Sequence, residues 1–540
     1  MHGSTHDVTN QAPALVDYDV FTADVALCEA VARHGAKEAV EDLSALGIRA
    51  GSEQAQRWGV EANANPPALR THDRFGTRID EVDFHPSWHR LLEVALDAGL
   101  HAAPWGPDAG PAAHVRRAAG FLVWSHAEAG HGCPVSMTYA AVPALRVDPA
   151  LAEVWEPRLR SRHYDGVLGP PAAKTGALAG MGMTEKQGGS DVRANTTRAE
   201  PAGADGFLLT GHKWFCSAPM SDLFLVLAQE PEGLSCFLVP RVLDDGARNV
   251  FRIQRLKDKL GNRSNASAEV EFDRTWAQRL GPEGRGVATI IEMVSATRLD
   301  CVLGSTALMR QAVAQATHHA AHRSAFGSLL AEQPLMRNVL ADLAVESEAA
   351  TALAIRLAAT VDSGERELRR LALAVGKYWV CKRTPAVVGE ALECLGGNGY
   401  VEESGLPRLY REAPLNSIWE GSGNVNALDV LRGLRRETAA FAAFLAECEL
   451  GRGADSRLDA ALDGLPAAVK AAEEGSARRL VEQLALVLQG SLLVRYAPAY
   501  VADAFCASRL TGEWGHAFGT LPAGLDVEAV VERTTPRLAR

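Results

Sequence analysis

The sequence predicts a multidomain protein in which a compact all-β domain lies between two helical regions. Its 540 residues are too many for one hydrophobic core, so several domains are expected. Apolar residues recur at three- and four-residue spacing up to about residue 180 and again from about residue 287. Between these regions lie short β-rich stretches separated by Gly, Pro, Asp and Asn. The expected order is therefore α, then β, then α.

The N-terminal region, 1–180, is expected to be helical. The stretches "TADVALCEAVARHGAKEAVEDLSALG" and "SWHRLLEVALDAGL" carry the helical spacing. Segments rich in Pro and Gly, such as "NANPPALRTHDRFG" and "APWGPDAGP", are expected to be loops between helices.

The middle region, 181–286, is expected to form the β domain. Its candidate strands include "GFLLTG", "KWFCS", "LFLVLAQ", "LSCFLVP" and "ASAEVEF". Helical periodicity then continues through a bundle at 287–440 and an additional helical domain at 441–540. In the last domain one apolar helix face is formed by Leu480, Val481, Leu484, Val487 and Leu488.

Composition narrows the class of protein. A net charge of −11 argues against a protein that mainly coats nucleic acid or anionic membrane. The nine cysteines are scattered and form no C-x-x-C pair, which favours reduced thiols over a zinc site or a disulfide framework. No signal peptide is apparent, and no apolar run approaches the roughly 18–20 residues of a membrane span. We expect a cytoplasmic protein without a metal site or a membrane partner.

Two stretches contain clustered glycines. In "MGMTEKQGGSDVRANT", glycines and hydroxyls suit a polar, planar or anionic ligand, although a turn between strands is an equally ordinary explanation. In "ALECLGGNGYVEESGLPRLYRE", three glycines follow an apolar helical run. One glycine could end that helix, and three suggest close approach of a phosphate.

A third stretch, "NSIWEGSGN", places Glu420 between bulky Ile418–Trp419 and small residues. Apolar neighbours raise the pKa of a carboxyl group, which makes it a better base near neutral pH. The alternative is that Glu420 caps the following helix, "NVNALDVLRGLRR", or interacts with its dipole.

Taken together, these stretches resemble the signature patterns of the acyl-CoA dehydrogenase flavoprotein family. Residues 182–194, "GMTEKQGGSDVRA", and 393–412, "ECLGGNGYVEESGLPRLYRE", match two patterns, and "WEGSGN" matches a third. The resemblance spans roughly residues 90–440, and "KDKLGNRSNASAEVEF" with the long C-terminal extension is similar to the alkylation-response (AidB) branch. It implies an N-terminal α bundle, a β barrel or sandwich, a C-terminal α bundle and an extra helical region.

The resemblance implies FAD as cofactor. The implied contacts within one subunit are Met181, Met183, Thr184, Gly189, Ser190, Phe215, Ser217, Gly396, Gly397, Ser422 and Asn424. Arg323 and Phe326 match residues that reach the FAD of a neighbouring subunit, which implies a homo-oligomer, in particular a tetramer. Trp214 is expected to face away from the flavin, and Gln333 and Glu393 depart from the family pattern.

The resemblance also implies an enzymatic role for Glu420 as the base that removes the α-proton of an acyl-CoA while hydride leaves the β-carbon for the flavin. Some family members place the base before a conserved arginine, where this chain has Thr297 before Arg298. Threonine cannot serve as this base, so Glu420 is the matching residue. Ser190 and Arg298 are the implied substrate-side residues.

Three functions follow from these observations. The first is an acyl-CoA dehydrogenase that passes electrons to an electron-transfer flavoprotein. The second, implied by the AidB branch, is a flavoprotein that binds double-stranded DNA and protects it from alkylation, with little dehydrogenase turnover. Residues 441–540 hold 10 Lys and Arg against 13 Asp and Glu, which weakens this second function. The third is a scaffold that holds FAD structurally.

Overall fold

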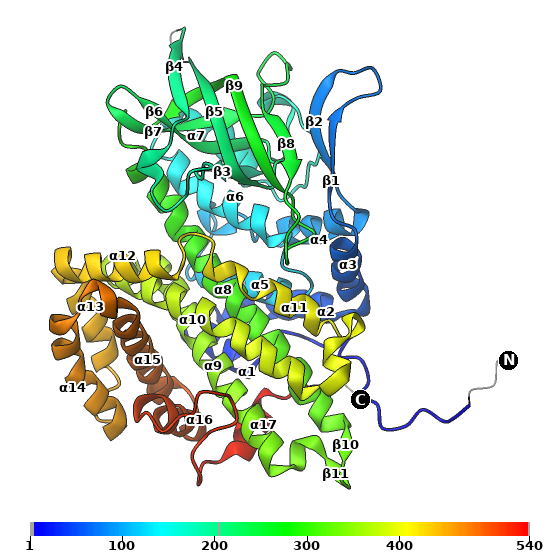
Figure 1. Cartoon of the computed structure of the whole chain (residues 1–540), viewed down its shortest axis with the longest axis vertical. Helices are drawn as coiled ribbons and strands as arrows, with labels where there is room; N and C mark the ends of the chain where they lie inside the picture. Colours follow the sequence, from blue (N-terminus) through cyan, green and yellow to red (C-terminus); the bar gives the residue numbers. More distant parts are fainter. Residues whose placement is uncertain (1–4, 204–205, 538–540) are drawn as a thin grey trace. The chain divides into compact units, whose positions relative to one another are not determined.

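The computed structural model describes residues 5–203 and 206–537, which form two compact units. The first, here called the sheet unit, contains Gln54–Ala113 and Ala127–Asp300. The second, the helical unit, contains the described residues up to Glu53, His114–His126 and those from Cys301 onward. The β-rich segment and the helical segments that the sequence predicts are both present (Figure 1).

A closed β structure forms the centre of the sheet unit. Its strands are β3 (Ala179–Gly182), β4 (Arg198–Ala202), β5 (Gly206–Ser217), β6 (Leu223–Glu230), β7 (Gly233–Pro240), β8 (Arg252–Leu256) and β9 (Ser267–Leu280). They are ordered β3-β6-β4-β5-β9-β7, and antiparallel pairing of β6 with β7 closes the ring. β8 pairs with β9. Side chains such as Phe224, Phe237 and Phe251 fill the interior, so the barrel is packed with aromatic residues.

The remaining elements of the sheet unit include a hairpin that the sequence analysis assigned to a loop. The helices are α3 (Glu53–Ala64), α4 (Pro86–Asp97), α6 (Gly132–Leu145) and α7 (Pro149–Leu159), and α6 contacts β3. The hairpin pairs β1 (Ala68–His72) with β2 (Arg78–Asp83). The Asp73 carboxylate accepts hydrogen bonds from the backbone N–H groups of Phe75 and Thr77, and Gly76 has a φ of +83°. This side-chain cap makes "HDRFGT" a tight turn.

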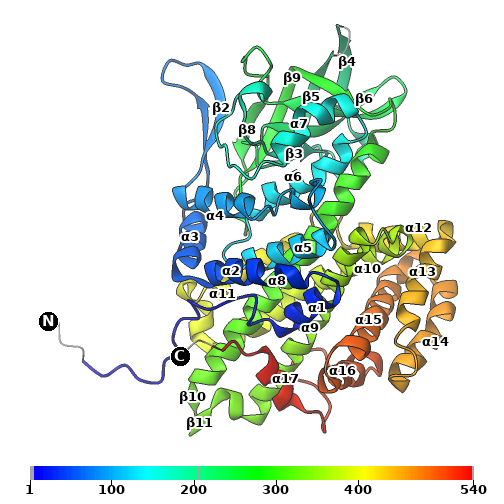
Figure 2. The same cartoon turned by 180° about the vertical axis from the view of Figure 1, so that it is seen from behind.

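Long helices dominate the helical unit (Figure 2). α9 (Pro334–Asp362) and α10 (Arg366–Cys394) pack together, and α10 also contacts α12, α13 and α15. α8 (Gly286–His322) contributes its first part to the sheet unit and its remainder to the helical unit. The other elements are α1 (Val25–Arg33), α2 (Val40–Gly51), α5 (Ala113–Trp124), β10 (Ser324–Ala325), β11 (Ser328–Leu329), α11 (Leu406–Glu412), α12 (Gly423–Arg436), α13 (Thr438–Glu449), α14 (Ser456–Ala471), α15 (Ala477–Tyr496), α16 (Ala499–Phe505) and α17 (Val527–Thr534).

Buried ion pairs join the C-terminal helices to α9. The Arg509 guanidinium lies 2.5 Å from Asp342 and 3.0 Å from Glu346, and all three side chains are buried. Arg533 pairs with Glu348 at 3.0 Å. The residues after 440 are mainly helical, as the sequence predicts. They belong to the same compact unit as α9 and α10.

None of the helices in the described parts of the chain combines the length and the apolar character that crossing a membrane requires.

Candidate functional site

In the sheet unit, the first glycine-rich stretch follows strand β3. Met181, Met183 and Thr184 are partly exposed, so their atoms are accessible to a ligand. The Thr184 carbonyl accepts a hydrogen bond of 2.8 Å from the backbone N–H of Trp214 on β5. A Cβ atom added to Gly189 would lie 2.5 Å from Thr184 Oγ1, so the chain needs a glycine there. Ser190 is exposed beside it.

A buried ion pair lies beneath this stretch. Lys213 Nζ is 2.7 Å from Glu185 Oε1, and both side chains are inaccessible to solvent. Glu185 also accepts hydrogen bonds from the backbone N–H groups and hydroxyls of Thr196 and Thr197. Burial by itself would raise the pKa of Glu185, but the Lys213 ammonium and these donors hold it well below its usual range. Glu185 therefore anchors the stretch and is not a candidate base.

Strand β5 presents two aromatic side chains where its register shifts, between Lys213 and Cys216. Phe215 is 50 % exposed. Lys257 Nζ lies 3.2 Å from the ring centroid of Trp214 and 4.6 Å from that of Phe215. The register shift interrupts strand alternation, and the two rings share the Lys257 cation. The orientation of Trp214 away from the flavin stays a prediction. Ser217 is partly exposed at the end of the strand.

In the helical unit, Glu420 lies in a short loop with left-handed backbone. Its φ is +56° and that of Gly421 is +99°, a conformation that costs a non-glycine residue energy and persists only where the surroundings hold it. The Gly421 carbonyl oxygen accepts hydrogen bonds from Lys377 Nζ (2.5 Å) and Asn426 Nδ2 (2.6 Å), and both donor side chains are buried. Two buried donors on one carbonyl fix the peptide between Gly421 and Ser422, directly after the left-handed residues.

The surroundings of Glu420 differ in part from the sequence interpretation. Glu420 is half-buried, and its Oε2 atom is inaccessible to solvent. Ile418, which was expected to shield the acid, is 61 % exposed. α12 begins at Gly423 with Ser422 as its N-cap residue, two positions beyond Glu420, so Glu420 is not the N-cap. Thr297 is buried, and its hydroxyl bonds backbone carbonyls of its own helix.

The glycines after α10 have three separate roles. Gly396 follows the C-cap Leu395 with a φ of +59° and ends the helix as a left-handed residue. A Cβ atom on Gly399 would lie 2.0 Å from the Leu392 carbonyl oxygen, so Gly399 is needed for packing. Gly397 meets neither requirement, and the space beside it is open. The space beside Gly396 is open as well, so a ligand could approach the backbone at both Gly396 and Gly397.

The remaining predicted residues lie on accessible parts of their units. Phe326 is fully exposed in the turn between β10 and β11, and the Arg323 guanidinium donates to the Asn10 carbonyl. Gln333 donates to the Ala325 carbonyl at 2.8 Å and so supports the same turn. Ser422 and Asn424 are exposed, and Asn424 Oδ1 accepts from Arg478 Nε at 2.8 Å. Arg298 is half-buried in the sheet unit.

The structure gathers the predicted residues into groups within each unit. The sheet unit carries the glycine and hydroxyl stretch beside exposed Phe215, a surface that suits a planar ring system. The helical unit carries the Glu420 loop. Sequence reasoning missed Lys377 and Lys257, because no local pattern indicates that a lysine will contact a segment far away in the chain. It also missed the bond of Asn426 to the Gly421 carbonyl, and it named Arg478 only as a candidate DNA contact.

The barrel of the sheet unit and the long helices of the helical unit agree with the acyl-CoA dehydrogenase class, which comparison with known proteins establishes. Three family models match the chain: the adaptive response protein AidB N-terminal domain over residues 10–166, the acyl-CoA dehydrogenase middle domain over 180–275, and the acyl-CoA dehydrogenase C-terminal domain over 284–435. The putative acyl-CoA dehydrogenase AidB of Escherichia coli is 46 % identical over 95 % of this chain and 96 % of its own. The chain belongs to the acyl-CoA dehydrogenase family, in its AidB group.

Proteins of Caenorhabditis elegans are also similar. Acyl-CoA dehydrogenase family member 11 is 32 % identical over 85 % of this chain and 77 % of its own. The crystal structure of ACDH-11 in complex with C11-CoA matches with a TM-score of 0.84 and 27 % identity, covering 100 % of this chain and 95 % of that chain.

Proposed function

We propose that the protein is an FAD-dependent acyl-CoA dehydrogenase in which Glu420 is the catalytic base. The observation that carries this proposal is the loop of Glu420, whose left-handed backbone is held by buried Lys377 and Asn426. An acid needed only for solubility would not require such an arrangement. The AidB relative and the C11-CoA complex of the worm protein support the substrate class.

The residues present fit FAD. Phe215 offers an exposed ring beside accessible hydroxyls, Gly397 leaves open space at its backbone, and Ser422 and Asn424 are exposed next to the Glu420 loop. When bound, FAD supplies the hydride acceptor. The flavin contacts of the remaining predicted residues, Met181, Met183, Thr184, Gly189, Ser190, Ser217 and Gly396, belong to this same proposal.

The chain's own contribution is to hold and move one proton. A Glu420 carboxylate takes the proton from the carbon next to the thioester carbonyl, and that carbon's electron pair forms the double bond as hydride leaves the β-carbon. Lys377 and Asn426 keep the Glu420 backbone fixed during this transfer. Ser190 and Arg298 are proposed to contact the substrate.

The test is to purify the protein, record the flavin spectrum and add acyl-CoAs of varied chain length without oxygen. Bleaching of the oxidised flavin band by at least one thioester is the expected result. A protein that stays colourless after incubation with FAD, or whose flavin no thioester bleaches, would contradict the proposal.

We also propose a homotetramer located in the cytoplasm, with an electron-transfer flavoprotein as acceptor. The fully exposed Phe326 beside Arg323 supports an interface between subunits, and all nine cysteines are free thiols. Sedimentation of FAD-loaded protein should give a tetramer, and Phe326→Ala should lower both FAD content and subunit number. A monomer that retains FAD would contradict this assembly.

A second candidate function is binding of double-stranded DNA. Basic side chains lie at both ends of α12: Arg478 bonds Asn424 at its start, and Arg435 donates to the Ala472 carbonyl near its end. Most other arginines after residue 440 are neutralised by the chain's own carboxylates; examples are Arg452, Arg457 and Arg495. We therefore propose at most weak, salt-sensitive binding along α12.

A further inference from the structure

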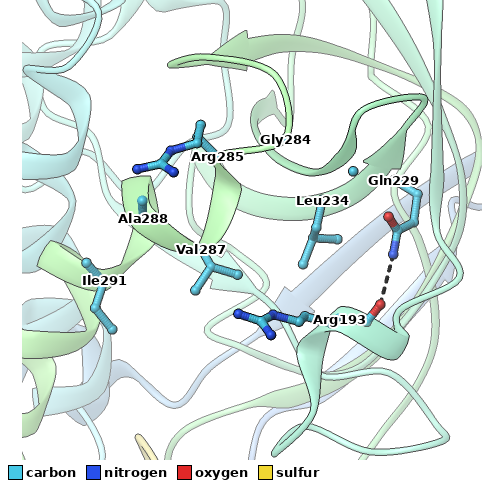
Figure 3. Close-up of a pocket in the computed structure, with 9 residues that line it drawn as sticks. Arg193, Gln229, Leu234, Gly284, Arg285, Val287, Ala288 and Ile291 are labelled. Carbon is cyan, nitrogen blue, oxygen red and sulfur yellow. Dashed lines mark hydrogen bonds between the residues drawn. The ribbon is translucent and has the colours of Figure 1, made fainter. Parts of the chain in front are cut away.

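A cavity of about 520 Å³ lies within the sheet unit (Figure 3). Its walls come from three segments: the turn that carries Arg193, the β6–β7 hairpin with Gln229 and Leu234, and the start of α8 with Arg285 and Val287. This volume is within the range of roughly 300–1,000 Å³ that is usual for small-molecule sites.

The charged groups of this cavity are all positive. None of the lining residues is acidic, and within the described chain neither the Arg193 nor the Arg285 guanidinium has a partner. The nearby carboxylates of Glu230 and Glu283 are both occupied by Arg279, at 3.1 and 3.3 Å. The first turn of α8 holds no acidic residue, so its N–H groups add to the positive potential.

The segment that carries Arg193 is fixed in place. Gln229 Nε2 donates to the carbonyls of Arg193 (3.1 Å) and Asn195 (2.9 Å), which ties this turn to strand β6. Buried Leu234 and partly exposed Val287 supply apolar surface in the same cavity. The site therefore combines two guanidinium groups with an apolar wall.

We propose that this cavity binds the phosphorylated nucleotide end of the acyl thioester, with Arg193 and Arg285 as the phosphate ligands. The inference rests on the proposed function and deepens it. Guanidinium groups form strong charge-assisted hydrogen bonds with phosphate, and the apolar wall suits the remainder of the carrier. The two arginines thus select thioesters whose carrier is phosphorylated.

The test uses full-length, FAD-loaded protein and two probes. Calorimetry with adenosine 3′,5′-bisphosphate measures binding of the nucleotide end without the acyl chain. Calorimetry with inorganic phosphate distinguishes a nucleotide site from a simple anion site. Arg193→Gln and Arg285→Gln should each weaken bisphosphate binding about tenfold. Arg274→Gln, an exposed arginine on β9 outside the cavity, is the matched control and should leave the Kd unchanged.

The second measurement compares decanoyl-CoA with the decanoyl thioester of pantetheine, which has no phosphate. The variants should raise the concentration needed for half-maximal flavin bleaching only for the CoA thioester. Absence of bisphosphate binding, equal binding of inorganic phosphate, or equal effects on both thioesters would overturn the site. If bisphosphate binds but no thioester bleaches the flavin, the site stands and the proposed function fails.

A second inference, which rests on an independent observation, concerns Lys377. This lysine of α10 is 1 % exposed, and its one hydrogen bond in the described chain is to the Gly421 carbonyl. A buried ammonium group is costly unless its position is needed. Asn426, which is fully buried, donates to the same oxygen.

We infer that Lys377 is a positioning residue that holds Glu420 in its left-handed conformation for proton abstraction. This also rests on the proposed function. If the Gly421 peptide were free to rotate, Glu420 would relax to an ordinary right-handed or extended backbone and its carboxylate would move. Small displacements of a reacting group lower rates strongly, on the order of 10²-fold for about 1 Å.

Stopped-flow flavin reduction at varied acyl-CoA concentration tests this role. Lys377→Met should lower the limiting rate about 10- to 100-fold with an unchanged acyl-CoA Kd, and Lys377→Arg should restore part of it. Asn426→Leu, which removes the other donor, should act in the same direction if Lys377→Met fails to fold. Lys382→Met, an exposed lysine on the same helix, is the control. An unchanged limiting rate in both variants, with the wild type active, would overturn the inference and leave the proposed function intact.

Discussion

Two glutamates near glycines, Glu185 after β3 and Glu420 before α12, are held in opposite ways. Glu185 is inaccessible to solvent, pairs with Lys213 and accepts hydrogen bonds from two threonines. Glu420 is half-buried on a left-handed backbone, and the nearby buried lysine, Lys377, bonds the adjacent carbonyl. In the first case the protein saturates the carboxylate, and in the second it fixes the backbone.

Under the proposed function, Glu185 is the acid that serves stability and Glu420 is the acid that serves chemistry. A carboxylate saturated by donors has its pKa held low and cannot accept a proton near neutral pH. A carboxylate on a fixed backbone is held in a defined place, as a proton-abstracting group requires. Exchanging Glu420 for glutamine should therefore lower the rate of flavin reduction, and exchanging Glu185 for glutamine should lower the stability.

Glu420→Gln tests the chemical half of the comparison and has the largest expected effect. Glutamine is nearly isosteric but cannot take the proton, so flavin reduction by an acyl-CoA should slow about 10²–10⁴-fold. FAD content and melting temperature should stay close to wild type. Stopped-flow reduction and a thermal melt on the same sample check this. A normal rate with a lowered melting temperature would show that Glu420 has a structural role and not a catalytic one.

Glu185→Gln tests the structural half. Removal of one partner leaves Lys213 charged, buried and uncompensated, so the free energy of unfolding should fall by about 3–5 kcal/mol. Urea unfolding followed by circular dichroism measures the change. Glu200→Gln on β4, an exposed position, is the control and should change stability by less than about 0.5 kcal/mol. Equal stability of the two variants would mean that the buried pair contributes nothing net.

His34 sharpens the comparison because its burial lacks a compensating carboxylate bond. Burial, with Arg356 and Arg33 nearby, lowers its pKa from 6.5 to about 4. The folded state then binds fewer protons than the unfolded state, so stability falls as the pH drops from about 6.5 toward 4. At pH 5 the loss is about 2 kcal/mol relative to pH 8. His34→Asn should flatten this part of the stability–pH curve, and an unchanged curve would contradict the assignment.

The smallest expected effect concerns DNA. Arg435→Ala with Arg436→Ala should weaken duplex binding by several-fold, and added salt should weaken the wild type steeply. Arg452→Ala is the control, because Arg452 already pairs with Glu449 and Asp463. Fluorescence anisotropy at two salt concentrations measures both. Sub-micromolar binding that resists physiological salt would contradict the expectation of weak binding that the excess of Asp and Glu in residues 441–540 gives.

Much of the fold could be predicted from the sequence, because the α–β–α order depends on periodicity alone. The β1–β2 hairpin was assigned to a loop, since its short polar strands have no apolar alternation and its turn depends on the Asp73 side chain. The register shift in β5 was not predicted, nor was the contact of Lys257 with the rings of Trp214 and Phe215. A bulge depends on the partner strand, which the sequence does not identify.

The site was predictable only where the residues lie in motifs. Glu420 and the glycines stand in local patterns, but Lys377 and Lys213 read as surface lysines until tertiary contacts bury them. The glycine cluster was predicted to approach a ligand as a group. The structure leaves open space beside Gly396 and Gly397, whereas Gly399 is packed against the end of α10.

The ion pairs that join the C-terminal helices to α9 determine how the protein can be dissected. A chain shortened after α15 would leave Asp342 without Arg509 and Glu348 without Arg533, while Glu346 would keep its pairing with Arg383. Each orphaned carboxylate would destabilise the fold, so lost DNA binding or lost activity in such a truncation would report misfolding. Point substitutions of exposed residues on α12 leave these ion pairs intact, so they test a function of this region without disturbing α9.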